Sequence, residues 1–180
     1  MSRDGAQLGP TLLKVVVPII ATGVVLVAAR RRHLSWREDL GLARPAAGEA
    51  LLWLALYLVL VLGSNHFMGW RGPWDFSIWA RTPLPVAVLR ILAVGILGPI
   101  AEELIFRGYL YARLIHTRWG AAGTIAVLAA GFAVLHTAYS GGVVALIFVA
   151  GLMLGVARYR SGTVVVPMLM HITWNLYAVW

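Results

Sequence analysis

The sequence contains no cysteine, and only 12% of its 180 residues are charged. Without cysteine the chain has no disulfide, no thiolate nucleophile and no cysteine ligand for a metal ion. A soluble domain carries about 25% charged and about 45–50% apolar residues, whereas 61% of this chain is apolar. So few charges do not cover a globular surface in water, and we therefore expect an integral membrane protein.

Three motifs of membrane hydrolases are also missing. The chain has no Gly-x-Ser-x-Gly elbow, no pair of aspartates inside an apolar run and no His-Glu-x-x-His sequence. The first absence makes a serine hydrolase a poor fit, because that elbow presents the nucleophile. The second excludes an aspartyl intramembrane protease, and the third disfavours a zinc protease without excluding it.

The apolar residues form six runs, each close to the roughly 20 residues that a membrane-spanning helix needs. They cover residues 11–29, 46–64, 85–105, 120–139, 142–157 and 163–180. Six spans leave no room for a soluble domain, so we expect an all-α polytopic transmembrane helical bundle. This bundle forms a single membrane domain over residues 1–180. Its first part, 1–84, holds two N-terminal spans and a tryptophan-rich interfacial loop from residue 65 onward, and 85–180 holds a four-span core.

The net charge is +8, but its distribution does not favour nucleic acid as a partner. Five arginines fall in residues 30–45, three in 106–119 and two in 158–162, against three on the opposite side of the predicted spans. Arginines that gather in alternate connections are typical of membrane orientation. We expect these connections in the cytoplasm and both termini outside.

The third run ends with two acids, and an arginine follows just after it; ionisable groups at bilayer depth mark candidate functional sites. Glu103 and Arg107 are four residues apart on one helix face and are expected to form an ion pair. Glu102 is turned about 100° away from Glu103 and has no such partner. An unpaired carboxylate in a dry site suits a general base, although the same three residues also suit a buried ion-pair network that only fixes packing.

Two histidines lie in later runs. Phe132 precedes His136 by one helical turn in the fourth run, and His171 precedes Asn175 by one turn in the sixth. Taken alone, each pair is consistent with helix packing or with hydrogen bonding between helices.

The expected depths of these groups favour a shared site. Glu102 and His136 each lie 17 residues from Trp119, where the third and fourth runs turn, so both are about 25 Å from that turn. His171 and Asn175 lie roughly 16 and 22 Å from the turn that joins the last two runs. We therefore expect an acid, two imidazoles and an amide at a common level.

Three other features of the spans have simpler explanations. Lys14 lies near a span end, where its long side chain reaches the interface. Gly98-Pro99 is expected to break or kink the third helix just before the acids. Gly151 and Gly155 form a small-residue face, for which internal packing is favoured over association with another helix.

Taken together, Glu-Glu-x-x-x-Arg at 102–107, Phe-x-x-x-His at 132–136 and His-x-x-x-Asn at 171–175 resemble the motifs of a known family. This is the CPBP family (CAAX protease and bacteriocin-processing, also called Abi) of intramembrane endopeptidases. The resemblance covers residues 85–180, which makes the four-span core the catalytic part. It implies hydrolysis of a peptide bond in a membrane-associated protein or peptide, by a multi-pass protein of the bacterial inner or plasma membrane that contacts the lipid bilayer.

The resemblance also implies roles for the motif residues. Glu102 with His136 would activate the attacking water, and His171 with Asn175 would stabilise the oxyanion. The residues implied to support the site are Glu103, Arg107 and Phe132. The glutamate-type mechanism of the family needs no cofactor. The chain has fewer spans than the eukaryotic CAAX prenyl endopeptidases, and smaller members resemble processors of bacteriocin leaders, of self-immunity systems, or of C-terminal sorting and anchor segments.

Two alternatives stay open at this point. Glu102, His136 and His171 form a set of two histidines and one carboxylate that would suit a zinc ion with one open position. A non-catalytic immunity or binding protein would use the same polar layer to grip a peptide or a partner helix. A transporter is disfavoured, because one polar layer does not make a pathway across the bilayer.

Overall fold

The computed structural model describes residues 3–68 and 82–179. Its elements in chain order are α1 (Arg3–Arg31), α2 (Ala47–Met68), α4 (Leu84–Arg90), η1 (Ile91–Leu97), α5 (Gly98–Glu103), η2 (Leu104–Leu110), α6 (Tyr111–Leu114), α7 (Gly120–Val134), α8 (Gly141–Ser161) and α9 (Val165–Val179). The described residues contain no β-strand, so the expected all-α bundle is confirmed. The expected tryptophan-rich loop falls mostly on residues 69–81, which lie outside the described part.

Four helices are long and apolar enough to cross a membrane. They are Gly9–Arg31, Ala47–His66, Leu84–Leu114 and Gly141–Ser161. The apolar helix α7 is shorter, and α9 has 15 residues. Each of the six expected spans therefore has a helical counterpart in a bundle that is apolar enough for a membrane.

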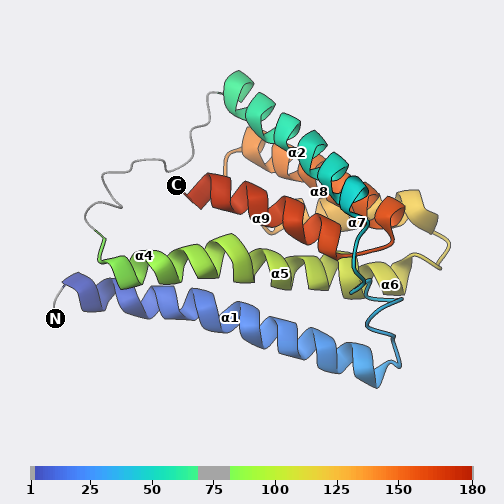
Figure 1. The fold of residues 1–180 in the computed structure, drawn as a ribbon, viewed down its shortest axis with the longest axis horizontal. Helices are drawn as coiled ribbons and strands as arrows, with labels where there is room; N and C mark the ends of the chain where they lie inside the picture. Colours follow the sequence, from blue (N-terminus) through green and yellow to red (C-terminus); the bar gives the residue numbers. More distant parts are fainter. Residues whose placement is uncertain (1–2, 69–81, 180) are drawn as a thin grey trace.

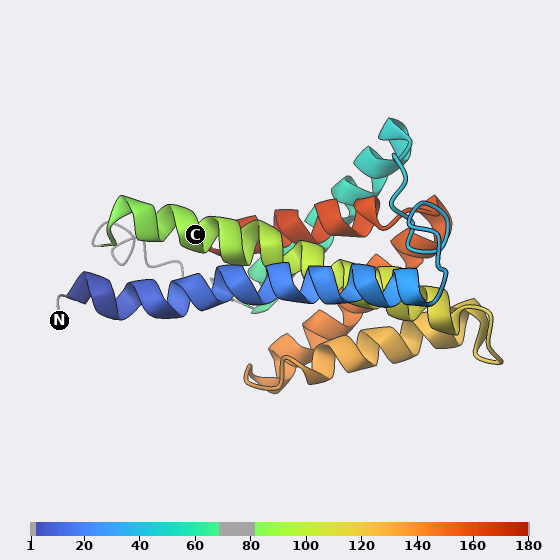
Figure 2. The ribbon, with the colours of Figure 1, turned by 90° about the horizontal axis from the view of Figure 1, so that it is seen from below.

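The helices form a bundle in which α1 begins and α9 ends at the same end. Figure 1 shows α1 beside the long helix that runs from α4 to α6, with both running in the same direction. On the other side of that helix, α9 packs against η1 and α5, and α2 and α8 cover α9. Figure 2 shows α7 and α8 as a pair that diverges from this group. The arginine-rich connections before α2, α7 and α9 all lie at the end opposite the termini (Figure 1).

The third helix is longer than the sequence predicts. Its expected end is residue 105, whereas the elements α4 to α6 form one continuous helix, Leu84–Leu114. The helix continues because Tyr111 packs inside the bundle and the charge of Arg107 is paired there. The placement of Arg107 in a connection was therefore wrong.

The fourth helix is shorter than expected, because α7 ends at Val134 and not at residue 139. The ring Nδ1 of His136 lies 2.8 Å from the carbonyl oxygen of Phe132. That carbonyl is the one that the His136 amide needs to continue an α-helix. The amide bonds the carbonyl of Ala133 instead, so His136 stands in the turn that follows the helix.

The third helix does not break at Gly98-Pro99, where the sequence predicts a break or a kink. The helix passes through these residues by widening into the π-helical turn η1, where the amide of Gly98 donates to the carbonyl of Ala93, five residues back. A wider turn relieves the clash between a proline ring and the preceding turn. Single π-turns of this kind are common at functional sites.

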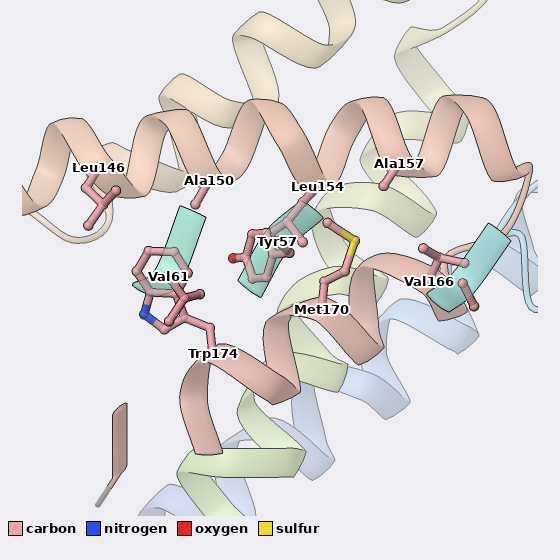
Figure 3. Packing of buried hydrophobic residues seen from close by; sticks show 10 residues of the cluster. Tyr57, Val61, Leu146, Ala150, Leu154, Ala157, Val166, Met170 and Trp174 are labelled. Atoms are coloured by element: carbon pink, nitrogen blue, oxygen red, sulfur yellow. The ribbon is translucent and has the colours of Figure 1, made fainter. Parts of the chain in front are cut away.

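One apolar cluster fixes α9 against α2 and α8. Its buried members recur at steps of three, four or seven residues along each helix and are Ala50, Tyr57, Val61, Leu146, Ala150, Leu154, Ala157, Val166, Met170 and Trp174. Figure 3 shows these side chains from three helices meeting in one layer. Because Met170 points into this cluster, the next residue, His171, is turned about 100° toward the long helix.

The glycines of α8 serve internal packing, as the sequence analysis favours. A Cβ atom on Gly155 would lie 2.8 Å from Cγ2 of Ile125 on α7, and one on Gly151 would lie 3.2 Å from the Cα of Ala129. The close approach of α7 and α8 therefore depends on the missing side chains. This approach brings Phe132 of α7 to the polar layer.

We expect Gly155→Ala to destabilise the protein by about 1–3 kcal/mol, the usual cost of overpacking, because the β-branched Ile125 cannot move aside. Gly23→Ala is the matched control, since a Cβ on Gly23 of α1 meets nothing within 4 Å. Thermal unfolding in detergent measures both variants. Equal midpoints for the two would contradict the packing role of Gly155.

Candidate active site

The polar layer begins with a buried ion pair on the third helix. Nη1 of Arg107 lies 2.9 Å from Oε1 of Glu103, and the two side chains are 1% and 0% exposed. The spacing of the two residues predicts this pair, and the structure contains it. Nη2 of Arg107 also donates to the main-chain carbonyl of Gly151 at 3.0 Å, which ties the ion pair to α8.

His171 bridges the two adjacent acids. Its Nδ1 lies 2.9 Å from Oε1 of Glu103, and its Nε2 lies 3.7 Å from Oε2 of Glu102. An ionised carboxylate only accepts hydrogen bonds, so Nδ1 carries the proton and Nε2 faces Glu102. The sequence analysis pairs Glu103 with Arg107 alone, whereas the structure gives Glu103 a second partner on α9.

His136 reaches the same region from the turn after α7. Because its Nδ1 donates to the carbonyl of Phe132, the Nε2 of the neutral ring keeps its lone pair. The Phe132 ring contacts both imidazoles, with centroids 4.7 Å from His136 and 5.6 Å from His171. The guanidinium of Arg107 lies 4.9 Å from the same ring. Glu102 lies within electrostatic range of both histidines.

Asn175 is held by a carbonyl that the π-turn leaves free. Its Nδ2 donates to the main-chain oxygen of Val94 at 2.9 Å. In an α-helix that oxygen would accept from Gly98, but the Gly98 amide bonds Ala93. In the π-helical register the donor would be the residue five positions on, and that residue is Pro99, which has no N–H. Asn175 therefore takes the place of the missing donor.

Glu102 and Asn175 open onto a pocket of about 350 Å³ between α1, the third helix and α9. The pocket is otherwise lined by Leu13, Lys14, Val17, Pro18, Ala93, Val94 and Gly98. His136 and His171 do not line it. The side chain of Glu102 is 39% exposed, so a carboxylate and an amide from two helices meet at an apolar pocket of the size that holds a short peptide segment.

The comparison with protein families decides what kind of protein carries this arrangement. Residues 84–177, just over half of the chain, match the model described as type II CAAX prenyl endopeptidase Rce1-like. The chain belongs to this family. The Rce1-like family is the CPBP family of the sequence analysis, so the resemblance drawn from the three motifs is confirmed. The description of this family names a CAAX prenyl endopeptidase.

A relative from Escherichia coli, the "Uncharacterized 24.3 kDa protein", is 33% identical over 104 residues. That alignment covers 55% of this chain and 46% of the relative, so the chain spans about half the length of the curated protein that it matches. No solved structure matches the chain. The Rce1-like match contains every predicted site residue, while α1 and α2 lie outside it.

The zinc alternative requires that Glu102, His136 and His171 converge on one ion. Among the residues that the structure describes, no three His, Asp or Glu side chains gather in a way that would hold a metal ion. The Nδ1 atoms of His136 and His171 are engaged by Phe132 and Glu103, which leaves the Nε2 atom of each ring free. Among the described residues Glu102, His136 and His171 are not gathered into a preformed zinc site, and no step below uses a metal.

Arg158 is a site residue that sequence reasoning missed, because it was counted among the charges of a connection. It is 5% exposed; its Nε donates to the carbonyl of Arg107 and its Nη2 to that of Asp39, each at 3.0 Å. Like the Val94 carbonyl, the Arg107 carbonyl lies in a π-turn, where the amide of Tyr111 bonds other carbonyls. The only sequence signal was the helical register, which places Arg158 on the buried face with Leu154.

We expect Pro99→Ala to lower kcat by about 10–100-fold, the effect of a displaced catalytic group, without lowering stability. The new N–H at position 99 would bond the Val94 carbonyl and release Asn175. Steady-state kinetics and thermal unfolding measure the two effects, with Pro85→Ala at the exposed start of α4 as the control. Asn175→Ala should not add to the loss. A fall in stability with unchanged kcat would show that Pro99 acts on folding alone.

Proposed function

We propose that the chain is an endopeptidase that hydrolyses a peptide bond of a membrane-associated protein or peptide, with water activated by Glu102. The observation that carries this proposal is the position of Glu102. Its carboxylate opens onto the pocket beside Asn175 and lies 3.7 Å from Nε2 of His171, whose other nitrogen is bonded to Glu103. A base, a polarising amide and an oriented imidazole thus come from two helices.

The proposed reaction starts from the Nδ1 protons that the hydrogen bonds fix on the two histidines. Glu102, assisted by the free Nε2 of His136, takes a proton from water, and the resulting hydroxide attacks the carbonyl carbon of the scissile peptide bond. The electron pair of the C=O bond moves to oxygen. Asn175 has a second N–H, and the doubly protonated form of His171 would present an Nε2–H; in this proposal both donate to the oxyanion. Collapse breaks the C–N bond, and Glu102 returns the proton to the leaving amine.

Glu103 and Arg107 position these groups and do not touch the substrate in this proposal. The His171 ring keeps its orientation because its Nδ1 donates a hydrogen bond to the fixed carboxylate of Glu103. Arg107 neutralises Glu103, and Phe132 packs against both imidazoles. Rigid support of this kind holds reacting groups to the small tolerances that catalysis requires.

The substrate follows from the apolar surroundings of the pocket. A peptide that reaches Glu102 passes between helices that lie in the bilayer, so it belongs to a membrane-associated protein. A C-terminal sorting or anchor segment, a leader peptide and a CAAX-like segment all satisfy this condition. We place the protein in the bacterial inner membrane, with the arginine-rich end of the bundle in the cytoplasm.

Comparative proteomics of cells that express the wild type or Glu102→Gln tests the function. An endopeptidase predicts an uncleaved membrane precursor that accumulates only with the variant. Glu38→Gln, an acid in the exposed connection after α1, is the control and should behave as the wild type. Identical membrane proteomes, together with an unchanged phenotype in the Glu102 variant, would favour the non-catalytic binding protein.

Prolonged treatment with EDTA is expected to leave the activity of the purified protein unchanged, because the proposed steps use side chains and water and no metal ion. Activity is measured on the precursor before and after the chelator is removed. If EDTA abolishes the activity and added zinc restores it, the glutamate-type mechanism is contradicted. Glu102, His136 and His171 would then be the expected metal ligands.

A further inference from the structure

The pocket contains a cation that the proposed reaction does not use. Lys14 is the single lysine of the chain, and it lines the pocket together with Glu102 and Asn175. Among the side chains that the structure describes, the Lys14 ammonium forms no ion pair or hydrogen bond. Snorkelling accounts for a lysine near a span end, but a charge without a partner is expensive beside apolar walls, so an anionic ligand in the pocket would lower that cost.

The register of the two helices sets the distance between Lys14 and Glu102. The helices α1 and α4–α5 run side by side in the same direction (Figure 1). The pocket is lined from Leu13 to Pro18 on α1 and from Ala93 to Glu102 on the long helix. Because the two helices are parallel, we expect Lys14 at the same end of the pocket as Val94, with Glu102 eight residues farther along. Eight residues of helix rise about 12 Å, and a lysine side chain spans roughly half of that distance. An extended peptide covers the remaining 6–12 Å with about two to four residues.

We propose that Lys14 determines specificity by binding a carboxylate of the substrate two to four residues from the scissile bond. This inference rests on the proposed function. The ammonium attracts the anion to one end of the pocket, and the carboxylate of Glu102 repels it from the other, so the bound segment has one preferred direction. Because α1 lies outside the Rce1-like match, the N-terminal helix supplies this specificity to the family core.

The carboxylate has two chemical sources, a free C-terminus or an acidic side chain. A lipid phosphate is a rival occupant of another class. The pocket favours the peptide, because it also presents Glu102 and Asn175, the groups that are proposed to act on a peptide bond. The test separates all three.

The experiment uses the full-length protein in nanodiscs that contain phosphatidylglycerol. The probe is a pool of apolar synthetic peptides prepared in three forms: with a free C-terminal carboxylate, with a C-terminal carboxamide, and with a carboxamide plus one internal aspartate. Mass spectrometry measures which peptides are retained and which are cleaved. The variants are Lys14→Gln and Lys14→Arg, with Arg30→Gln at the exposed end of α1 as the control for net charge.

We expect the wild type to retain and cleave at least one acid-bearing form about tenfold better than the neutral form, the worth of one charge-assisted hydrogen bond. The cleaved bonds should lie two to four residues from the carboxylate. Lys14→Gln should abolish the preference, whereas Lys14→Arg and Arg30→Gln should keep it. The form that is preferred identifies the source of the carboxylate.

Equal treatment of acidic and neutral peptides by the wild type, or an unchanged preference in Lys14→Gln, would overturn the proposal. Loss of co-purifying phosphatidylglycerol in Lys14→Gln without a change in peptide preference would also overturn it, in favour of a headgroup site. Cleavage without preference rejects the role of Lys14 alone. If retention depends on Lys14 but no peptide is cleaved, the protease is rejected and the binding site is kept. If no peptide is retained and none is cleaved, both proposals are rejected.

Discussion

Replacing Glu102 by glutamine is expected to lower kcat by about 10²–10⁴-fold, the usual contribution of a general base, with little change in stability. Glutamine has nearly the same shape but does not accept the proton of the attacking water. The stability should persist because the Glu102 side chain is 39% exposed and lies 3.7 Å from Nε2 of His171, too far for a strong ion pair. Purified variants are compared on the precursor that the proteomic experiment identifies.

His136→Ala and His171→Ala belong in the same measurement, with Glu38→Gln as the control. Both histidine variants should lose cleavage while they still insert into the membrane. Turnover by Glu102→Gln at the wild-type rate would contradict the role of Glu102 as the base. A normal rate in only one histidine variant would reject the role of that histidine and leave Glu102 in place.

Glu103→Gln is expected to destabilise the protein by about 3–5 kcal/mol, because it leaves a buried arginine without its counter-ion. Arg107 is 1% exposed, and its charged partner in the described residues is Glu103. The same change removes the anionic acceptor of His171 Nδ1. A single substitution therefore combines a folding defect with a catalytic one, and thermal unfolding alone does not separate them.

The double variant Glu103→Gln/Arg107→Met separates the two effects. It removes the unpaired charge along with its partner, so much of the lost stability should return. Activity should stay low, because His171 still lacks its charged acceptor. Recovery of activity together with stability would show that Glu103 serves only to balance Arg107 and does not orient the histidine.

Much of the site follows from spacing alone. The i,i+4 positions of Glu103 and Arg107 predict the ion pair that the structure contains, because a helix places such residues on one face. The same rule predicts the contact of Phe132 with His136. The end of α7 could not be predicted in this way, because it depends on the His136 imidazole taking a carbonyl from its own helix.

The sequence alone determined that the chain crosses a membrane, that its hydrophilic motifs sit on three helices, and which family those motifs belong to. Composition and residue order suffice for this, since low charge and short local spacings act within one helix. Only the tertiary structure decided that Glu103 binds His171, that Asn175 occupies the carbonyl freed before Pro99, and that Lys14 faces the pocket of Glu102. These contacts join residues 68 to 88 positions apart, and the packing of α1 and α9 against the third helix sets them.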